Sequence, residues 1–204
     1  MKWLKRKFKK LWHKVKKKAD RKVITPAKLP SKLEMGFVRP HNNYAQGAVN
    51  KTKNVSEFGY FALMYRELAT PFKWTTRLNI RGQLAKAYGE LADMGVNFSI
   101  EPHENAYNKR VGGFECLILA GDKTSEIYAQ LYLSIMEKHF PNMHNRGLKT
   151  VQSGDRGYAN LYAARKAGMK VAILSENFFI DNDKDWIEPK ALAAVYDELY
   201  KLTK

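Results

Sequence analysis

Two of the five histidines in this chain occupy the same kind of position. His41 closely follows the apolar segment GFVRP and His103 closely follows FSIEP, and each then leads into a polar loop that contains asparagine. Glu57 stands at the expected start of a helix, and Glu176 ends the apolar segment MKVAILSE. Two imidazoles and one carboxylate are a normal ligand set for a catalytic Zn²⁺ that keeps one position for water. A second carboxylate, not bound to the metal, would act as the general base.

The spacing of these residues does not by itself bring them together, because histidines in loops are also common as polar surface residues. The other histidines are weaker candidates: His13 lies in a basic extension, and His139 and His144 flank a Pro-Asn sequence that predicts a surface turn. The single cysteine, Cys116, lies in an apolar segment and is expected to be inert core. A disulfide within the chain and a cysteine-rich zinc site are therefore excluded, so any metal must be held by histidine and carboxylate.

Strand-like and helix-like segments alternate along the chain, which predicts an α/β fold. We expect a single domain with a central, mostly parallel or mixed sheet flanked by helices, since 204 residues with 45% hydrophobic content can bury one core. The expected strands are 33–39, 72–78, 96–100, 113–120 and 170–174. The expected helices are 56–68 with Ser56 as N-cap, 80–94, 125–139, 158–167 and the segment from Pro189 to about residue 202. Residues 40–54 and 101–108 are expected to be polar loops.

The positive charge of the chain is unevenly distributed. The chain has 36 Lys and Arg residues against 20 Asp and Glu residues, a formal net charge of +16. Residues 1–22 contain twelve of the basic residues and a single acid, Asp20, whereas residues 23–204 contain 24 basic and 19 acidic residues. The chain therefore divides into a strongly basic extension (1–22), a proline-flanked linker (23–32) and a modestly basic domain (33–204).

The basic extension has the pattern of an amphipathic helix. Its apolar residues recur mostly at spacings of three and four, with lysines between them: Trp3, Leu4, Phe8, Leu11, Trp12, Val15 and Ala19. A cationic helix of this kind lies in an anionic membrane or lipopolysaccharide surface, and the segment resembles cationic antimicrobial peptides. A solvated basic tail or a nucleic-acid-binding arm are the alternatives, but the apolar stripe with two tryptophans favours the membrane surface, and we expect no specific nucleic acid partner.

The sequence contains neither a membrane span nor a secretory signal. No apolar run approaches the roughly 20 residues that a transmembrane helix needs, and no apolar h-region follows the N-terminal charges. We therefore expect synthesis in a cytoplasm without a signal peptide.

From Met35 to about Trp186 the chain resembles the zinc N-acetylmuramoyl-L-alanine amidases of phage endolysins and bacterial cell-wall remodelling. The family begins with a strand, a histidine and a Gly-Ala pair, which corresponds here to His41 and Gly47-Ala48, and its second ligand, a glutamate that opens a helix, corresponds to Glu57. Further matches follow in the family's order: Thr76-Arg77, the third ligand His103 in His103-Glu104-Asn105-Ala106, Gly113-Phe114-Glu115, Asn145-Arg146-Gly147-Leu148-Lys149, and the terminal strand that contains Glu176.

This resemblance implies a function. His41, Glu57 and His103 would bind Zn²⁺, and Glu176 would be the catalytic acid/base of a hydrolase that cuts the amide between N-acetylmuramic acid and L-alanine in peptidoglycan. An endolysin that acts in the periplasm and cell wall as a monomer is the expected role, and Arg146 is a candidate contact for the peptide stem.

Three features depart from the family pattern. His41 lacks the usual Gly-Gly after it, and Glu101 and Pro102 separate Ile100 from His103, so this strand end must bulge or extend to present the imidazole. Glu104, beside His103, could compete as a ligand or face solvent, and we expect it to face solvent.

Two other functions remain open. A zinc peptidase that acts on peptidoglycan stem peptides is one, but the usual His-x-x-Glu pair is missing at His41 (His-Asn-Asn-Tyr) and at His103 (His-Glu-Asn-Ala). The other is a cationic membrane-active or nucleic-acid-binding protein in which the domain is passive.

Overall fold

The computed structural model of the chain describes residues 33–76 and 83–204. The expected N-terminal helix (1–22), the linker (23–32) and Arg77 lie outside the described residues. Among the described helices, none is long and apolar enough to cross a membrane.

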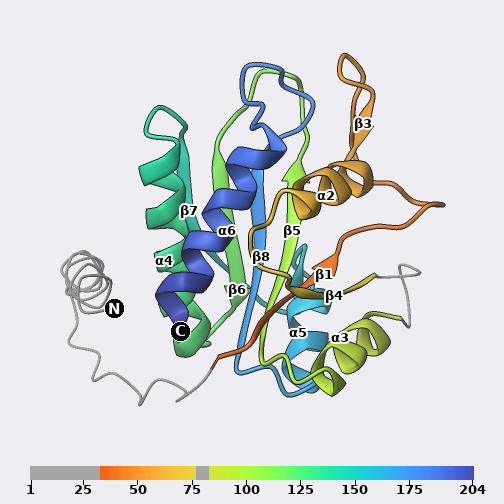
Figure 1. The fold of residues 1–204 in the computed structure, drawn as a ribbon, viewed down its shortest axis with the longest axis vertical. Coiled ribbons are helices and arrows are strands. Elements are labelled where there is room, and N and C mark those ends of the chain that lie inside the picture. Colours follow the sequence, from red (N-terminus) through yellow and green to blue (C-terminus); the bar gives the residue numbers. More distant parts are fainter. Residues whose placement is uncertain (1–32, 77–82) are drawn as a thin grey trace.

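A six-stranded mixed sheet forms the centre of the molecule, in the order β4-β1-β5-β8-β6-β7 (Figure 1). Neighbouring strands are parallel except for β6 and β8, which are antiparallel, so the expectation of a mostly parallel sheet is confirmed. The strands are β1 (Met35–Arg39), β4 (Lys73–Thr76), β5 (Phe98–Asn105), β6 (Phe114–Leu119), β7 (Asn145–Val151) and β8 (Val171–Phe179).

Within residues 33–76 and 83–204, five helices flank this sheet and cover both of its faces (Figure 1). They are α2 (Glu57–Arg66), α3 (Leu84–Asp93), α4 (Lys123–His139), α5 (Tyr158–Lys166) and α6 (Pro189–Thr203). Residues of α2, α4 and α6 share one hydrophobic core, and residues of α3 and α5 share a second core on the opposite face. The single α/β domain expected from the alternation of elements is therefore confirmed, and its central strands are covered on both sides.

A short hairpin connects the sheet to α2. The expected polar loop after β1 contains β2 (Val49–Asn50), which pairs in antiparallel fashion with β3 (Val55–Ser56). The buried Asn50 anchors the hairpin, because its Nδ2 donates to the backbone oxygen of Ile180 at 2.9 Å. Ser56 then caps α2, accepting the N–H of Gly59 at 3.1 Å, as its position predicts. The hairpin thus returns the chain to the start of α2.

Three strands differ clearly from their sequence-based prediction. β8, expected to end at residue 174, continues to Phe179. β5 does not end at Ile100 but continues to Asn105, and each of its eight residues is buried. β7 was not predicted as a strand; it lies at the edge of the sheet, and its residues are mostly half-exposed or exposed. These errors have the same cause, because hydropathy identifies strands by apolar residues, and the missed segments carry polar ones.

Candidate metal centre

His41 lies just beyond β1, at a sharp change in chain direction. Its φ of 62° is in the left-handed region, which is uncommon for a residue other than glycine. The turn is closed by Asn42, whose side-chain oxygen accepts the N–H groups of Tyr44 at 2.9 Å and Ala45 at 3.0 Å. An asparagine turn therefore fixes the loop in which no Gly-Gly pair follows His41.

Glu57 is the first residue of α2, and Ala48, which precedes the hairpin, bonds both its backbone and its side chain. Its backbone N–H donates to the oxygen of Ala48 at 2.9 Å, and its carboxylate Oε1 accepts the N–H of Ala48 at 2.8 Å. The other oxygen, Oε2, lies 3.0 Å from Nε2 of His41 and 3.2 Å from Nδ1 of His103. One carboxylate oxygen is thus held by the backbone while the other faces both histidines.

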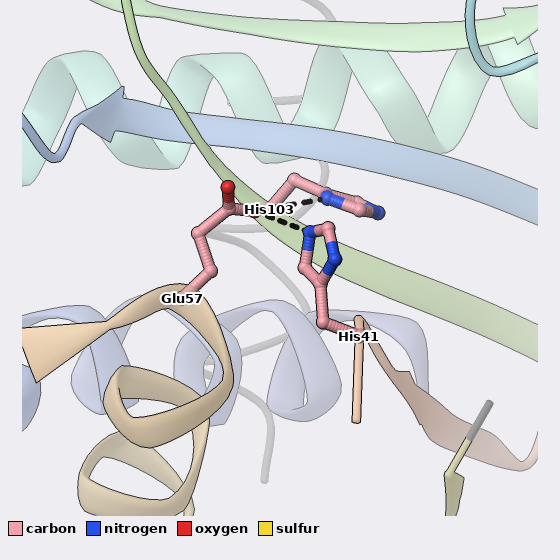
Figure 2. A group of neighbouring side chains, drawn as sticks. All are labelled: His41, Glu57 and His103. Carbon is pink, nitrogen blue, oxygen red and sulfur yellow. Dashed lines mark hydrogen bonds and ion pairs between the residues drawn. The ribbon is translucent and has the colours of Figure 1, made fainter. Parts of the chain in front are cut away.

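The structure brings His41, Glu57 and His103 together. One donor atom from each lies within 4.8 Å of the other two, and the two imidazole rings meet edge to face with centroids 5.3 Å apart. Figure 2 shows the three side chains pointing toward one another from the end of β1, the start of α2 and β5. Residues that are 16 and 46 positions apart in sequence therefore form one cluster.

The electrostatics of this cluster favour a positive charge at its centre. Burial alone would raise the pKa of Glu57, but hydrogen bonds from His103 and His41 outweigh it and hold the pKa far below its usual range. Burial alone would lower the pKa of His103, yet hydrogen bonds with Glu101 and Glu57 raise it to about 10. A buried carboxylate that remains ionised between two imidazoles is a suitable environment for a cation.

The donor set fits zinc. Two imidazole nitrogens and one carboxylate oxygen are ligands that Zn²⁺ takes at about 2.0–2.2 Å, which separates tetrahedral donors by roughly 3.4 Å. The contacts of 3.0 and 3.2 Å from Glu57 to the two rings are close to that spacing. Small adjustments of these side chains would accommodate the ion.

Gly47 makes this close approach possible. A Cβ atom at Gly47 would lie 2.7 Å from Nε2 of His41 and 2.9 Å from the carboxylate carbon of Glu57, and the residue has a φ of +77°. Glycine meets both requirements, because it adopts a left-handed backbone without strain and has no Cβ to clash with the two side chains.

Replacing Gly47 with alanine should therefore weaken zinc binding as well as stability. Gly121→Ala is the matched control, because Gly121 has a φ of +80° but nothing within 4 Å of its added Cβ. Both variants should lose about 1–2 kcal/mol from the left-handed backbone, whereas Gly47→Ala alone should lose zinc affinity, measured by competition with a chelating dye. Equal zinc affinities in the two variants would show that Gly47 does not shape the site.

Glu176 lies on the strand next to His103. It is inside β8 rather than at its end, and it pairs with His103 in the β5–β8 register. Its side chain is buried; Oε1 accepts a hydrogen bond from Nη2 of Arg156 at 3.0 Å, and Oε2 has no hydrogen-bond partner among the described residues. Burial raises the pKa of Glu176 to about 7, although His103 and Arg156 oppose the shift. A carboxyl group with a pKa near neutrality suits a general base.

One arginine contacts Glu176, and another contacts Glu115, which pairs with Glu176 in the β6–β8 register. Arg156, from the loop before α5, bonds Glu176, and Nε of Arg146 contacts Glu115 at 3.2 Å. Arg156 was not predicted, because nothing in a loop sequence shows that its side chain will reach a strand of the sheet. Arg146 was predicted as a contact for the peptide stem, and it lies on β7, over the ring of Phe179.

Glu104 does not face solvent, and this prediction is wrong. Only 2% of Glu104 is exposed, because strand alternation places it on the face of β5 opposite His103 and both faces of β5 are covered. Its Oε1 accepts from Nδ2 of Asn177 at 3.2 Å, and Oε2 has no partner among the described residues. Burial and the nearby Glu57 carboxylate raise the pKa of Glu104 well above its usual value.

The remaining candidates have structural roles. His139 ends α4, and its Nε2 contacts Glu198 at 2.9 Å, far along the chain from the cluster. Cys116 is fully buried in β6, where burial raises the pKa of its thiol, in keeping with an inert core residue.

The described part of the chain is thus an α/β domain that carries a candidate metal centre of two histidines and a glutamate. No protein-family model matches this sequence, and a search of curated proteins finds no significant match. Solved structures, in contrast, share its fold.

Three of these structures show the extent of the similarity. The catalytic domain of CwlV, an N-acetylmuramoyl-L-alanine amidase from Bacillus (Paenibacillus) polymyxa, aligns with a TM-score of 0.60 and 16% identity over 84% of this chain and 100% of that chain. The catalytic domain of the CD27L endolysin targeting Clostridia difficile aligns with a TM-score of 0.63 and 19% identity, over 83% of this chain and 97% of that chain. Cwp6 from Clostridium difficile gives a TM-score of 0.63 and 21% identity over 83% of this chain, which spans only 28% of Cwp6.

Proposed function

We propose that this protein is a zinc-dependent peptidoglycan hydrolase that cleaves the amide between N-acetylmuramic acid and L-alanine. The observation that carries the proposal is the convergence of His41, Glu57 and His103 beside the buried carboxylate of Glu176. The amidases among the solved structures with this fold support the choice of this amide bond.

His41, Glu57 and His103 would hold the metal. When bound, Zn²⁺ would lower the pKa of a coordinated water toward about 7 and polarise the substrate carbonyl. The N–H of Ala48 holds Oε1 of Glu57, and this orients the carboxylate so that Oε2 faces both histidines. The buried setting of Glu57 and His103 keeps bulk water from competing for these donor atoms.

Glu176 would move the proton. Arg156 holds Oε1, so Oε2 is the oxygen available to accept a proton from the attacking water. The same oxygen would then return the proton to the amide nitrogen, which is a poor leaving group unless it is protonated. A pKa of about 7 allows Glu176 to act in both directions near neutral pH.

Digestion of purified peptidoglycan sacculi tests the bond that is cut. We expect mass spectrometry of the released material to show stem peptides with a new free L-alanine amino group, together with glycan strands whose lactyl groups end in a free carboxylate. Zinc-free protein should release neither product. Cleavage between residues of the stem peptide would instead establish the peptidase alternative, and an unchanged sacculus in the presence of zinc would contradict both.

We further propose that the protein acts as an endolysin of the periplasm and cell wall, with residues 1–22 adding affinity for an anionic membrane or lipopolysaccharide surface. The match to an endolysin catalytic domain supports the first part, and the charge and apolar stripe of residues 1–22 support the second. In the sacculus assay, a chain without residues 1–22 should release the same products as the full chain.

A further inference from the structure

Glu101 is a buried acid that the proposed reaction does not use. It precedes His103 by two positions on β5, so both side chains lie on the same face of the sheet. Oε1 of Glu101 lies 3.0 Å from Nε2 of His103, while Nδ1 of the same ring lies 3.2 Å from Oε2 of Glu57. Each nitrogen of the His103 ring therefore faces a different carboxylate.

Glu101 is itself held in place from two helices. The hydroxyl of Tyr88, on α3, donates to its Oε2 at 2.7 Å. The side-chain amide of Asn160, on α5, lies 2.7 Å from Oε1 and 2.8 Å from Oε2. Glu101 has 0% exposure, and these donors hold its carboxylate in place.

A histidine that binds a metal through one nitrogen must carry its proton on the other. A carboxylate that accepts this second N–H fixes the tautomer and the ring orientation, and it makes the coordinating nitrogen more basic. Oε2 of Glu57 also contacts His41. The nitrogen of His103 that faces this oxygen, Nδ1, is therefore the one on the side where the three donor atoms meet. Glu101 lies at the other nitrogen of the ring, away from that meeting point.

We propose that Glu101 is a positioning residue, which accepts the Nε2–H of His103 and thereby presents Nδ1 to the zinc ion. This inference rests on the proposed function, since it requires a metal at His41, Glu57 and His103. It also gives α3 and α5 a role, because Tyr88 and Asn160 orient a metal ligand through Glu101.

The same inference explains the two residues that separate Ile100 from His103. Glu101 and Pro102 lengthen β5 rather than forming a loop, and they pair with Leu174 and Ser175 of β8. The register between β1 and β5 ends at Phe37 and Ile100. Pro102, which has no N–H to donate, therefore lies beyond the segment of β5 that is paired on both sides, where a strand tolerates proline.

The test compares zinc affinity in four proteins: wild type, Glu101→Gln, Tyr88→Phe and the control Tyr128→Phe. Tyr128 is a buried tyrosine on α4 that contacts Phe98 and not Glu101. We expect Glu101→Gln to lower zinc affinity by about 10–100-fold, Tyr88→Phe to lower it less, and Tyr128→Phe to leave it unchanged. Tyr88→Phe keeps the test valid if Glu101→Gln fails to fold.

Nuclear magnetic resonance of the cadmium-loaded, ¹⁵N-histidine-labelled protein provides a readout that a structural role would not change. In wild type, cadmium should couple to Nδ1 of His103, and the Nε2 proton should exchange slowly; in Glu101→Gln this proton should exchange faster. Coupling to Nε2, or wild-type zinc affinity in Glu101→Gln and Tyr88→Phe, would overturn this inference alone. A wild-type protein that binds no zinc would overturn the metal centre, and this inference with it.

Discussion

Replacing Glu176 with glutamine should lower the rate of amide hydrolysis by about 10²–10⁴-fold, the usual contribution of a general acid–base group, and should leave the zinc content unchanged. Glutamine keeps the size of the side chain and a hydrogen-bonding oxygen, but it cannot accept a proton from water. Glu176 is not among the three residues whose donor atoms converge. The measurement is product release from sacculi together with zinc analysis of the same preparation.

This substitution should also stabilise the metal-free protein above pH 7. Burial raises the pKa of Glu176 from 4.5 to about 7, so the folded chain binds this proton more tightly than the unfolded chain. The free energy of unfolding therefore falls as the pH rises from about 4.5 to 7, and at pH 8 the ionised carboxylate destabilises the fold. Glutamine removes this cost, and Glu176→Gln should unfold at a higher temperature than wild type at pH 8.

Glu198→Gln is the matched control for both effects, because Glu198 forms ion pairs with Lys138 and His139 and is remote in the chain from the candidate metal ligands. It should keep full activity. Wild-type turnover in Glu176→Gln would remove Glu176 from the mechanism, and a loss of activity accompanied by lower stability would point to misfolding instead.

Two of the three candidate ligands could be anticipated because they stand where an element begins or ends. His41 follows a strand, and Glu57 follows a serine that caps a helix, and both positions are visible in the pattern of apolar residues. The convergence of the three side chains could not be derived from spacing, since it depends on the hairpin that returns Ala48 to the start of α2. Those two-residue strands are too short to give a periodic signal.

The polar part of β5 shows where sequence reasoning fails. Glu101, His103 and Glu104 look like a loop because buried charged residues are rare. In the structure these residues are buried because they have hydrogen-bond partners, which a hydropathy pattern cannot show. Glu101 bonds Tyr88, and Glu104 bonds Asn177. Strand alternation could have predicted that Glu101 lies beside His103, because residues 101 and 103 share a face if the strand continues past Ile100.

Removing zinc should abolish hydrolysis and lower the melting temperature, and adding zinc back should restore both. An ion that binds only the folded chain stabilises it by about 4 kcal/mol when its free concentration is a thousand times Kd. For a chain of this length, each kcal/mol corresponds to about 2–4 °C, so saturating zinc should raise the melting temperature of the chelator-treated protein by about 8–16 °C.

His103→Ala should eliminate this rise in melting temperature and all zinc-dependent hydrolysis, because it removes one of the three converging donor atoms and the ring that Glu57 and Glu101 hold. His139→Ala is the control, since it loses a histidine whose partner is Glu198, and it should respond to zinc as wild type does. Calorimetry with and without zinc measures all three proteins. If His103→Ala shows the wild-type rise, zinc binds elsewhere in the chain, and the cluster of His41, Glu57 and His103 is not the metal centre.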